Sequence, residues 1–493
     1  MMAQQTSMQL HLQQALNWLS HAHGIGLASV VVDRVHTDSR SLQAGDLFVA
    51  LRGERFDGNQ FIAQAKAQGA VAVVCEASGQ AQAALHGLPA LVVPDARVAL
   101  GELAHGWRAQ FNLPLIAVTG SNGKTTVTQM VASILRTHAG THALSTQGNL
   151  NNDIGVPLTL FNLRAHHRIA VLELGMNHPG EIAYLAGLVQ AKVALVNNAQ
   201  REHQEFMGTV EAVAHENGAV LQALPSDGVA IYPADDTYTP VWQALAGSRK
   251  QHTFAMSFGG GLADDAAHSL ADVRAQDVAW QLDAWQFTLV TSQGTAPVRL
   301  HIAGRHNVKN ALAASACALA AGVPLSTVVQ GLQAFEPVKG RSRAWVVPSP
   351  SGNTTVVDDT YNANPDSVRA AIDVLAELPA PRLLVLGDMG EVGDQGAEFH
   401  AEVGAYAAER GIEAVYALGD LSAHAARAFG AAHHCSNMDQ LLAHVLQNAH
   451  QFQSVVVKGS RFMKMERVVE ALLSRGEDRH TEHHDQKGEA HAA

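Results

Sequence analysis

Residues 115–126 read LIAVTGSNGKTT, an apolar run that leads directly into a glycine-rich segment. Two glycines allow backbone N–H groups to turn toward phosphate oxygens, Lys124 adds a positive charge, and Thr125 offers a hydroxyl to Mg²⁺. A helix predicted over residues 124–138 would point the positive end of its dipole at the same anion. The stretch therefore predicts a nucleoside triphosphate site at the junction of a strand and a helix.

The segment departs from the usual G-x-x-x-x-G-K-[ST] phosphate loop at one position. Val118 stands five residues before Gly123, where that pattern has a glycine, so the loop is a shorter G-x-x-G-K-T-T variant. A tight strand-to-helix turn that binds no ligand is the alternative interpretation. The complete strand, loop and helix context favours the phosphate site.

Length and composition predict several α/β domains. A chain of 493 residues corresponds to about three domains at roughly 150 residues each. Hydrophobic residues make up 47% and aromatic residues only 5%, which is typical of an Ala/Val/Leu-rich α/β protein. The longest apolar runs are shorter than the ~20 residues of a membrane span. We expect no membrane span.

Charge, cysteine content and the N-terminus narrow the functional classes. A net charge of −12 argues against nucleic-acid and anionic-membrane binding, because both need clustered Lys and Arg. Cys75, Cys317 and Cys435 are too few for a disulfide framework or a Cys₄ zinc site, so we expect buried thiols. The first residues lack a basic segment followed by a continuous apolar one, so a signal peptide is not expected. The predicted location is the cytoplasm.

Strand and helix patterns predict three α/β domains in sequence order. Residues 1–112 form a small α/β domain, and residues 113–339 form a central doubly wound, mostly parallel sheet that carries the phosphate loop. Residues 268–302 show shorter strands with turn signals, which predicts an antiparallel insertion. Residues 340–475 repeat the alternation as a second doubly wound, Rossmann-like domain. Residues 476–493 are charged, lack large apolar side chains and are predicted to be a disordered tail.

Two residues downstream of the loop are candidate Mg²⁺ ligands. Glu173 ends the apolar run 169–174, where a carboxylate is costly without a cation, although a strand-end carboxylate can also reach solvent. His203, shortly after the run 192–197, is a weaker candidate. Ligands of open α/β sheets bind at the carboxyl ends of the strands, the edge where the phosphate loop lies.

Three polar clusters could present donors and acceptors to a substrate or could simply form turns. They are residues 147–155 (QGNLNNDIG), residues 358–365 (DDTYNANP) and residues 458–461 (KGSR). Each contains side chains of both hydrogen-bonding types. The residues alone leave both interpretations open.

Together these motifs resemble the Mur ligases, ATP-dependent enzymes that build the peptide of bacterial cell-wall precursors. The similarity covers nearly the whole chain. It is carried by the short phosphate loop, by GRHN at 304–307, by GR at 340–341, by GNLNNDIGVP at 148–157, by ELGMNH at 173–178 and by the clusters at 358–365 and 458–461. The last four are most similar to the member that adds a dipeptide.

The resemblance implies a fold, a reaction and a set of site residues. It implies an N-terminal domain for a UDP-sugar peptide, a central ATPase and a C-terminal domain that closes over the incoming dipeptide. The implied reaction joins D-alanyl-D-alanine to UDP-N-acetylmuramoyl-tripeptide through an acyl phosphate, with ATP and one or two Mg²⁺ ions, in a monomeric enzyme. The implied catalytic residues are Lys124, Glu173 and His203, and the implied metal ligands are Thr125, Glu173 and His203.

The remaining implied residues fall into two groups. Those expected around ATP are Gly120, Ser121, Asn122, Gly123, Lys124, Thr125, Thr126, His306, Asn307, Asn310, Arg341 and Asp359. Those expected to bind substrate are Ser39, Arg40, Asn149, Asn151, Asn152, Asn177, Tyr361, Asn362, Asn364, Lys458 and Arg461.

One position departs from the family pattern. Relatives commonly carry a carbamylated lysine near the second Mg²⁺, and this sequence has Asn217 there. We expect Asn217, helped by Glu216, to bind that ion directly or through water, and activity to be independent of lysine carbamylation. The alternatives are a sister ligase with another substrate and a homologue that binds nucleotide without ligating; the latter type tends to carry a four-cysteine ribbon, which three dispersed cysteines exclude.

Overall fold

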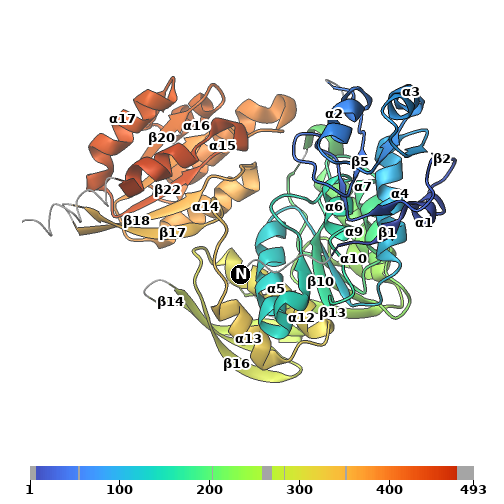
Figure 1. Ribbon diagram of the computed structural model, residues 1–493. Helices are drawn as coiled ribbons and strands as arrows, with labels where there is room; N and C mark the ends of the chain where they lie inside the picture. The colour runs from blue at the N-terminus through green and yellow to red at the C-terminus, as the bar shows by residue number, and fades with distance from the viewer. Residues whose placement is uncertain are drawn as a thin grey trace, which may run out of the picture.

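The computed structural model describes residues 7–53, 56–202, 204–257, 269–281, 284–349 and 352–474. Within them, three stretches of chain each build a sheet of their own, and Figure 1 shows the N-terminal stretch in blue and the C-terminal stretch in red on either side of the central one. His203 and the tail predicted over residues 476–493 lie outside the described residues. The prediction of an α/β fold with mostly parallel sheets is confirmed.

The N-terminal stretch forms a five-stranded sheet and a small two-stranded one. The five strands, in spatial order, are β2 (His23–Ile25), β7 (Ala90–Val92), β6 (Ala72–Cys75), β5 (Asp46–Val49) and β4 (Arg34–His36), and only β2 runs antiparallel to its neighbour. The two-stranded sheet pairs β1 (Leu10–His11) with β3 (Val31–Val32). The helices are α1 (Leu12–Leu16), α2 (Ile62–Ala67), α3 (Ala77–Leu85) and α4 (Ala96–Arg108).

Helix α4 ties the N-terminal stretch to the central one. It packs against α6 (Gly155–Leu160) and α7 (Glu181–Val189) of the next domain. The indole N–H of Trp107 donates to Leu163 O at 3.3 Å, and Arg108 Nε donates to Val189 O at 2.9 Å. Buried apolar residues are continuous across this contact, so the first two domains share a hydrophobic core.

The central sheet has nine strands and carries the phosphate loop near its middle. In spatial order they are β16 (Gly294–Leu300), β15 (Ala284–Thr291), β14 (Val273–Gln281), β13 (Lys250–Ala255), β12 (Val229–Pro233), β11 (Val193–Val196), β8 (Leu115–Thr119), β10 (Ile169–Glu173) and β9 (Ala143–Ser145). Strands β8 to β13 are parallel to their neighbours, and β14 is parallel to β13. Strand β8 is fully buried, as continuous apolar strands of parallel sheets are.

Helices cover both faces of the central sheet. They are α5 (Lys124–Ala139), α6, α7, α8 (Gln204–Met207), α9 (Val210–Gln222), α10 (Thr239–Ala246), α12 (His306–Ala320) and α13 (Leu325–Gln333). Ala117 of β8 belongs to the core on one face, and Ile116 and Val118 belong to the core on the other. The alanine-rich α12 packs closely against α5, because small side chains let two helices approach.

The antiparallel segment predicted over residues 268–302 is present but is not a separate insertion. Strands β14, β15 and β16 pair antiparallel with one another, and β14 also pairs parallel with β13. They therefore extend the central sheet at its edge. Alternation of apolar and polar residues predicts such strands but does not say which strand they pair with.

The C-terminal stretch forms a six-stranded sheet with helices on both faces. In spatial order its strands are β17 (Arg343–Ser349), β18 (Gly352–Asp359), β22 (Ser454–Lys458), β19 (Arg382–Gly387), β20 (Ala414–Leu418) and β21 (His433–Cys435). Only β17 is antiparallel to its neighbour. The helices are α14 (Pro365–Glu377), α15 (Gly396–Glu409), α16 (Ser422–Phe429) and α17 (Met438–Asn448).

Candidate active site

The segment between β8 and α5 has the backbone of a phosphate loop. Gly120 has φ +129° and Gly123 has φ +80°, conformations that favour glycine. A Cβ on Gly123 would stand 2.6 Å from Asn310 Oδ1 and 2.8 Å from Asn197 Nδ2. Any larger residue there would displace the asparagines that pack beneath the loop.

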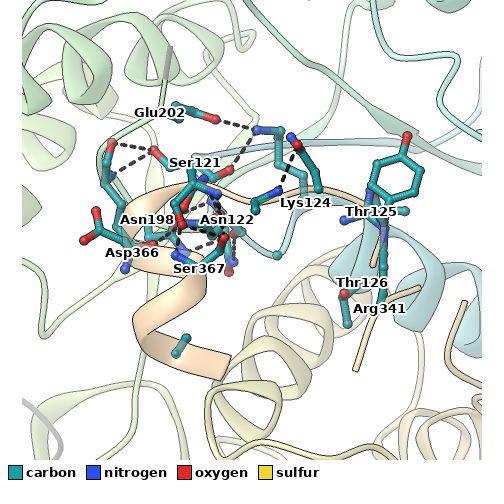
Figure 2. A pocket seen from close by; sticks show the side chains of 18 of the residues that line it. Ser121, Asn122, Lys124, Thr125, Thr126, Asn198, Glu202, Arg341, Asp366 and Ser367 are labelled. Carbon is teal, nitrogen blue, oxygen red and sulfur yellow. Dashed lines mark hydrogen bonds and ion pairs between the residues drawn. The ribbon is translucent and has the colours of Figure 1, made fainter. Parts of the chain in front are cut away.

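Lys124 opens α5 with its ammonium group folded back over the loop. Its Nζ donates to Gly120 O at 2.5 Å, to Ser121 O at 3.0 Å and to Glu202 Oε2 at 3.0 Å. The side chains of Lys124 and Glu202 are 15% and 6% exposed, so this is a nearly buried ion pair. Figure 2 shows the pair at the edge of the cavity described below.

Glu173 lies at the carboxyl end of β10, beside the first turn of α5. Its Oε1 accepts a hydrogen bond from Thr125 Oγ1 at 2.9 Å and another from Asn151 Nδ2 at 2.8 Å. Its Oε2 is buried and has no hydrogen-bond partner among the described residues, and the residue is 2% exposed. A buried carboxylate oxygen without a partner is costly, and oxygen ligands are those that Mg²⁺ prefers. The structure thus brings Thr125 and Glu173 together in an arrangement that fits a divalent cation.

A cavity of about 630 Å³ joins the central domain to the C-terminal one. Of the residues expected around ATP, all except Gly120 line it. Of the residues expected to bind substrate, those that line it are Asn149, Asn151, Asn152, Asn177, Tyr361, Asn362, Asn364 and Lys458. One cavity therefore contains residues from chain segments more than 300 positions apart.

The N-terminus of α12 contributes a hydrogen-bonded row of amides to the cavity. Asn307 Nδ2 donates to Ala303 O at 2.7 Å, and Asn310 Nδ2 donates to Asn307 Oδ1 at 2.9 Å. Asn197 Nδ2 in turn donates to Asn310 Oδ1 at 3.0 Å. Burial lowers the pKa of His306 below its ordinary value, which favours the neutral imidazole.

The C-terminal domain contributes a charged group at the ends of β18 and β22. Lys458 Nζ contacts Asp359 Oδ2 at 2.6 Å and donates to Asn362 O at 2.9 Å. The guanidinium of Arg341 lies 4.0 Å from the centroid of the Tyr361 ring, and its buried Nε has no acceptor among the described residues. A guanidinium with a buried, unused donor suits an anionic ligand.

Three of the expected substrate residues lie apart from this cavity. Ser39 and Arg40 belong to the N-terminal domain, where Arg40 is largely exposed and pairs with Asp38. Arg461 does not line the cavity; its guanidinium is 5.9 Å from the Tyr361 ring centroid.

Asn217 does not point into the cavity, contrary to the expectation that it binds a second Mg²⁺. Its Oδ1 accepts hydrogen bonds from Thr119 Oγ1 and, at 3.0 Å, from the N–H of Gly120, while its Nδ2 donates to Val213 O at 3.1 Å. Glu216 accepts from the N–H groups of Gly180 and Ile182, both at 2.8 Å, at the start of α7. The polar atoms of both side chains are thus used in hydrogen bonds within the protein. Those of Asn217 hold the start of the phosphate loop in place.

Several cavity residues were missed at the sequence level. They are Asn197, Asn198, Gln200, Arg201 and Glu202 after β11, and Asp236 and Lys309. The first five follow a buried strand directly, and Asp236 comes soon after β12, so the strand-end rule applied to Glu173 would have found them. Burial raises the pKa of Asp236, and Lys309 pairs with Asp235 at 2.7 Å.

Comparison with known proteins places the chain in a family. Residues 31–108 match the family described as Mur ligase family, catalytic domain; residues 118–318 match Mur ligase middle domain; residues 342–461 match Mur ligase, glutamate ligase domain. A UDP-N-acetylmuramoyl-tripeptide–D-alanyl-D-alanine ligase of Escherichia coli (strain K12) is 41% identical over 451 residues, or 91% of this chain and 95% of that relative. The chain belongs to the Mur ligase family. The resemblance noted from its motifs is confirmed.

Solved Mur ligase structures share the arrangement. A crystal structure of MurF from Acinetobacter baumannii is 35% identical and has a TM-score of 0.84, covering 94% of this chain and 98% of that one. MurF ligase from Thermotoga maritima, solved in complex with ADP, is 25% identical with a TM-score of 0.75, covering 90% and 98%. The similarity extends over all three domains.

Proposed function

We propose that this chain is an ATP-dependent ligase that joins D-alanyl-D-alanine to UDP-N-acetylmuramoyl-tripeptide, a step of peptidoglycan synthesis. The observation that carries the proposal is the single cavity in which the phosphate loop and Glu173 face Arg341, Asp359 and Lys458 of the C-terminal domain. The relatives named for this reaction match nine-tenths of the chain, which supports the substrate assignment.

The chemistry requires activation, because joining a carboxylate to an amine is uphill in water. A carboxylate oxygen of the tripeptide attacks the γ-phosphorus of ATP, the bond to the β–γ bridging oxygen breaks, and ADP leaves. The dipeptide amine then attacks the acyl carbon, the carbon–oxygen bond to phosphate breaks, and the amine proton passes to a base. The protein would supply positioning and charge, and Lys124, whose ammonium group lies over the phosphate loop, would neutralise the transferring phosphoryl group.

Mg²⁺ fits the residues present. Thr125 Oγ1 and the carboxylate of Glu173 would hold it, with His203 as a further expected ligand. Bound there, the ion would neutralise charge on the phosphate oxygens. Asn151 would keep the Glu173 carboxylate oriented, since it donates to the oxygen that Thr125 also contacts.

The three domains divide the substrates between them. We assign the UDP-sugar peptide to residues 1–112, with Ser39 and Arg40 among its contacts, ATP to residues 113–339, and the dipeptide to residues 340–475. Asn149, Asn151, Asn152, Asn177, Tyr361, Asn362, Asn364, Lys458 and Arg461 are proposed substrate contacts. We further propose a monomeric enzyme that works in the cytoplasm; across the described residues, no helix is long and apolar enough to cross a bilayer.

The decisive assay measures ADP release with UDP-MurNAc-tripeptide, ATP and Mg²⁺. We expect release to depend on D-Ala-D-Ala and to stay near background with single amino acids. The Lys124→Ala enzyme serves as the negative control, because it loses the expected phosphate contact; its urea midpoint is measured alongside to show that it is folded, since the change also removes the ion pair with Glu202. Equal release with a free amino acid would refute the dipeptide assignment, and wild-type release by Lys124→Ala would refute the site.

A further inference from the structure

The loop that follows β11, residues 197–202, lies between the phosphate loop and the C-terminal domain. On one side it contacts Ser121, Asn122 and Lys124, and on the other it contacts α14 and α15. We call residues 197–202 the bridging loop. Figure 2 shows Asn198 and Glu202 beside the phosphate loop and Asp366 and Ser367 of α14 close to them.

The bridging loop and the phosphate loop are joined by reciprocal hydrogen bonds. The N–H of Asn122 donates to Asn198 Oδ1 at 2.9 Å, and Asn198 Nδ2 donates to Asn122 O at 3.0 Å. The N–H of Gln200 donates to Ser121 Oγ at 2.8 Å, and Ser121 Oγ donates to Gln200 O at 3.2 Å. A displacement of either loop must therefore displace the other.

Glu202 adds a charge to this contact. Its carboxylate pairs with Lys124, the cation expected to meet the triphosphate. The phosphate oxygens of ATP compete with Glu202 for that ammonium group. Nucleotide binding would therefore weaken the ion pair that holds the bridging loop to Lys124. The loss of a nearly buried ion pair costs free energy, so the bridging loop would respond to the nucleotide.

Arg201, the residue before Glu202, points to the other domain. Its Nη2 contacts Asp366 Oδ1 at 2.6 Å, its Nη1 contacts Glu402 Oε2 at 2.7 Å, and its backbone N–H donates to Asp366 Oδ2 at 2.8 Å. The guanidinium also lies 5.3 Å from the centroid of the Phe399 ring. Side chains of Arg201, Asp366 and Glu402 are 24%, 20% and 34% exposed, so solvent screens the pairs only in part.

Helix α14 also contacts the phosphate loop without an intermediary. Asn364 caps α14, with its side chain accepting from the N–H of Ser367, and its Nδ2 donates to Asn122 Oδ1 at 3.1 Å. Asp366 lies two residues after Asn364. The N-terminal end of α14 therefore contacts both the phosphate loop and the bridging loop. The position of α14 is thus defined by the phosphate loop and by Arg201 together.

We propose that Arg201 is a positioning residue that couples nucleotide occupancy of the phosphate loop to the placement of the C-terminal domain. Consecutive residues of opposite charge carry the coupling: Glu202 holds Lys124, and Arg201 holds Asp366 and Glu402. Arg201 touches the second domain and not the reacting atoms. Its effect on turnover rests on the proposed function, because the C-terminal domain brings the dipeptide to the activated carboxylate.

The test compares Arg201→Ala with Arg201→Lys and with a matched control. Arg410→Ala removes an arginine that pairs with Asp373 at 2.8 Å within the C-terminal domain, away from the cavity. Affinity for a non-hydrolysable ATP analogue is measured by calorimetry. KM for D-Ala-D-Ala and kcat are measured by ADP release, and the analogue-induced change in radius of gyration is measured by small-angle scattering.

For Arg201→Ala we expect analogue affinity within about twofold of wild type, kcat/KM for D-Ala-D-Ala at least tenfold lower, and the analogue-induced change in radius of gyration lost. Arg201→Lys should recover part of both losses, since it keeps the charge but not the two-pronged geometry. Arg410→Ala should behave as wild type. Arg201→Ala and Glu402→Ala should be non-additive when combined, because they remove the same contact.

Several results would overturn the proposal. They are wild-type kcat/KM in Arg201→Ala, a radius of gyration that does not respond to the analogue in the wild-type protein, and a parallel tenfold loss of analogue affinity, which would make Arg201 a nucleotide contact. A failure of the proposed function looks different. In that case the wild-type chain shows no dipeptide-dependent ADP release, while the scattering response persists and is still lost in Arg201→Ala.

Discussion

Glu173 presents one buried carboxylate oxygen that no described group of the protein contacts. The other oxygen is held by Thr125 and Asn151. An arrangement with one oriented and one open oxygen is what a metal ligand needs, since the second oxygen can bind an ion without breaking existing hydrogen bonds. We therefore expect the Mg²⁺ concentration that the enzyme needs to depend on the Glu173 carboxylate.

Glu173→Gln keeps the shape of the side chain and removes its charge. We expect turnover to fall by about 100-fold or more, which corresponds to roughly 3 kcal/mol of lost transition-state stabilisation, and the Mg²⁺ concentration for half-maximal rate to rise. Steady-state rates over a Mg²⁺ titration measure both. Glu413→Gln, which changes a surface pair with Arg382, is the control. An unchanged Mg²⁺ dependence in Glu173→Gln would remove Glu173 from the metal site.

Asn217 illustrates a residue whose role the sequence did not reveal. The residue is 1% exposed, and its Oδ1 accepts hydrogen bonds from the Thr119 hydroxyl and the Gly120 N–H at the start of the phosphate loop. The three lysines among the residues that line the cavity, Lys124, Lys309 and Lys458, are each paired with a carboxylate. Independence from lysine carbamylation stays a prediction, and turnover that stopped on bicarbonate depletion and returned on its addition would contradict it.

Asn217→Ala should destabilise the central domain, because it leaves the Gly120 N–H and the Thr119 hydroxyl without their acceptor in a buried setting. We expect its free energy of unfolding to fall by about 1–3 kcal/mol. The urea midpoint of the central domain measures it, and Asn162→Ala, at an exposed side chain, is the control. A midpoint unchanged by Asn217→Ala would show that the loop does not depend on these hydrogen bonds.

At the scale of elements, three buried strands of the central sheet were predicted closely, and two strands at the edges of the C-terminal sheet were missed. Strands β8, β10 and β11 are fully buried and read as continuous apolar runs, so sequence alone located them within a residue or two. Strand β17 is an edge strand with no fully buried residue, and β21 has only three residues, HHC, so neither showed a pattern. The antiparallel strands were expected, but their pairing with β13 is a long-range contact that alternation does not encode.

The same reasoning applies to the site. That Lys124, Thr125 and Glu173 lie together could be predicted, because a phosphate loop and a strand end are local patterns; their roles stay predictions. Arg201 could not be assigned its partner, because Asp366 lies 165 positions further along the chain. Side chains that bind across a domain boundary leave no periodicity in the sequence.

A buried histidine in α15 predicts a dependence of stability on pH. His400 is fully buried, its Nδ1–H donates to Gly396 O at 2.6 Å, and its Nε2 accepts from the N–H of Met389 at 2.9 Å. Burial lowers its pKa below the ordinary 6.5. A protonated ring would lose the Met389 contact, so the folded protein holds this histidine neutral.

The sign follows from proton linkage. Below pH 6.5 the unfolded chain protonates His400 while the folded chain does not, so the stabilisation is complete above pH 6.5 and declines as the pH falls toward the lowered folded pKa. The slope is about 1.4 kcal/mol per pH unit for one such group. Urea unfolding of the C-terminal domain between pH 8 and pH 5 measures it, and His400→Asn should flatten the slope. A slope identical in the variant would exclude His400 as its source.

At the scale of the whole molecule, one cavity joins residues of the central and C-terminal domains, and the N-terminal domain is fused to the central one through α4. Two of the three domains thus share a core, while the third is held by polar contacts of Arg201 and Asn364 across the cavity and by apolar contacts at Ala303 and Trp280 of the central domain. Polar, partly exposed contacts are easier to break and remake than a shared apolar core. We therefore expect the C-terminal domain to be the part that moves during turnover.

The central claim is that this cavity transfers the γ-phosphoryl group of ATP to the substrate carboxylate. The most direct test uses UDP-MurNAc-tripeptide in which both oxygens of the reacting carboxylate are labelled with ¹⁸O. Mass spectrometry then measures the label in the inorganic phosphate that the reaction releases. With ATP, Mg²⁺ and D-Ala-D-Ala, an acyl phosphate transfers one labelled oxygen to phosphate and leaves the other in the new amide, so each phosphate should carry one ¹⁸O. Phosphate released without label while the amide forms would contradict the account.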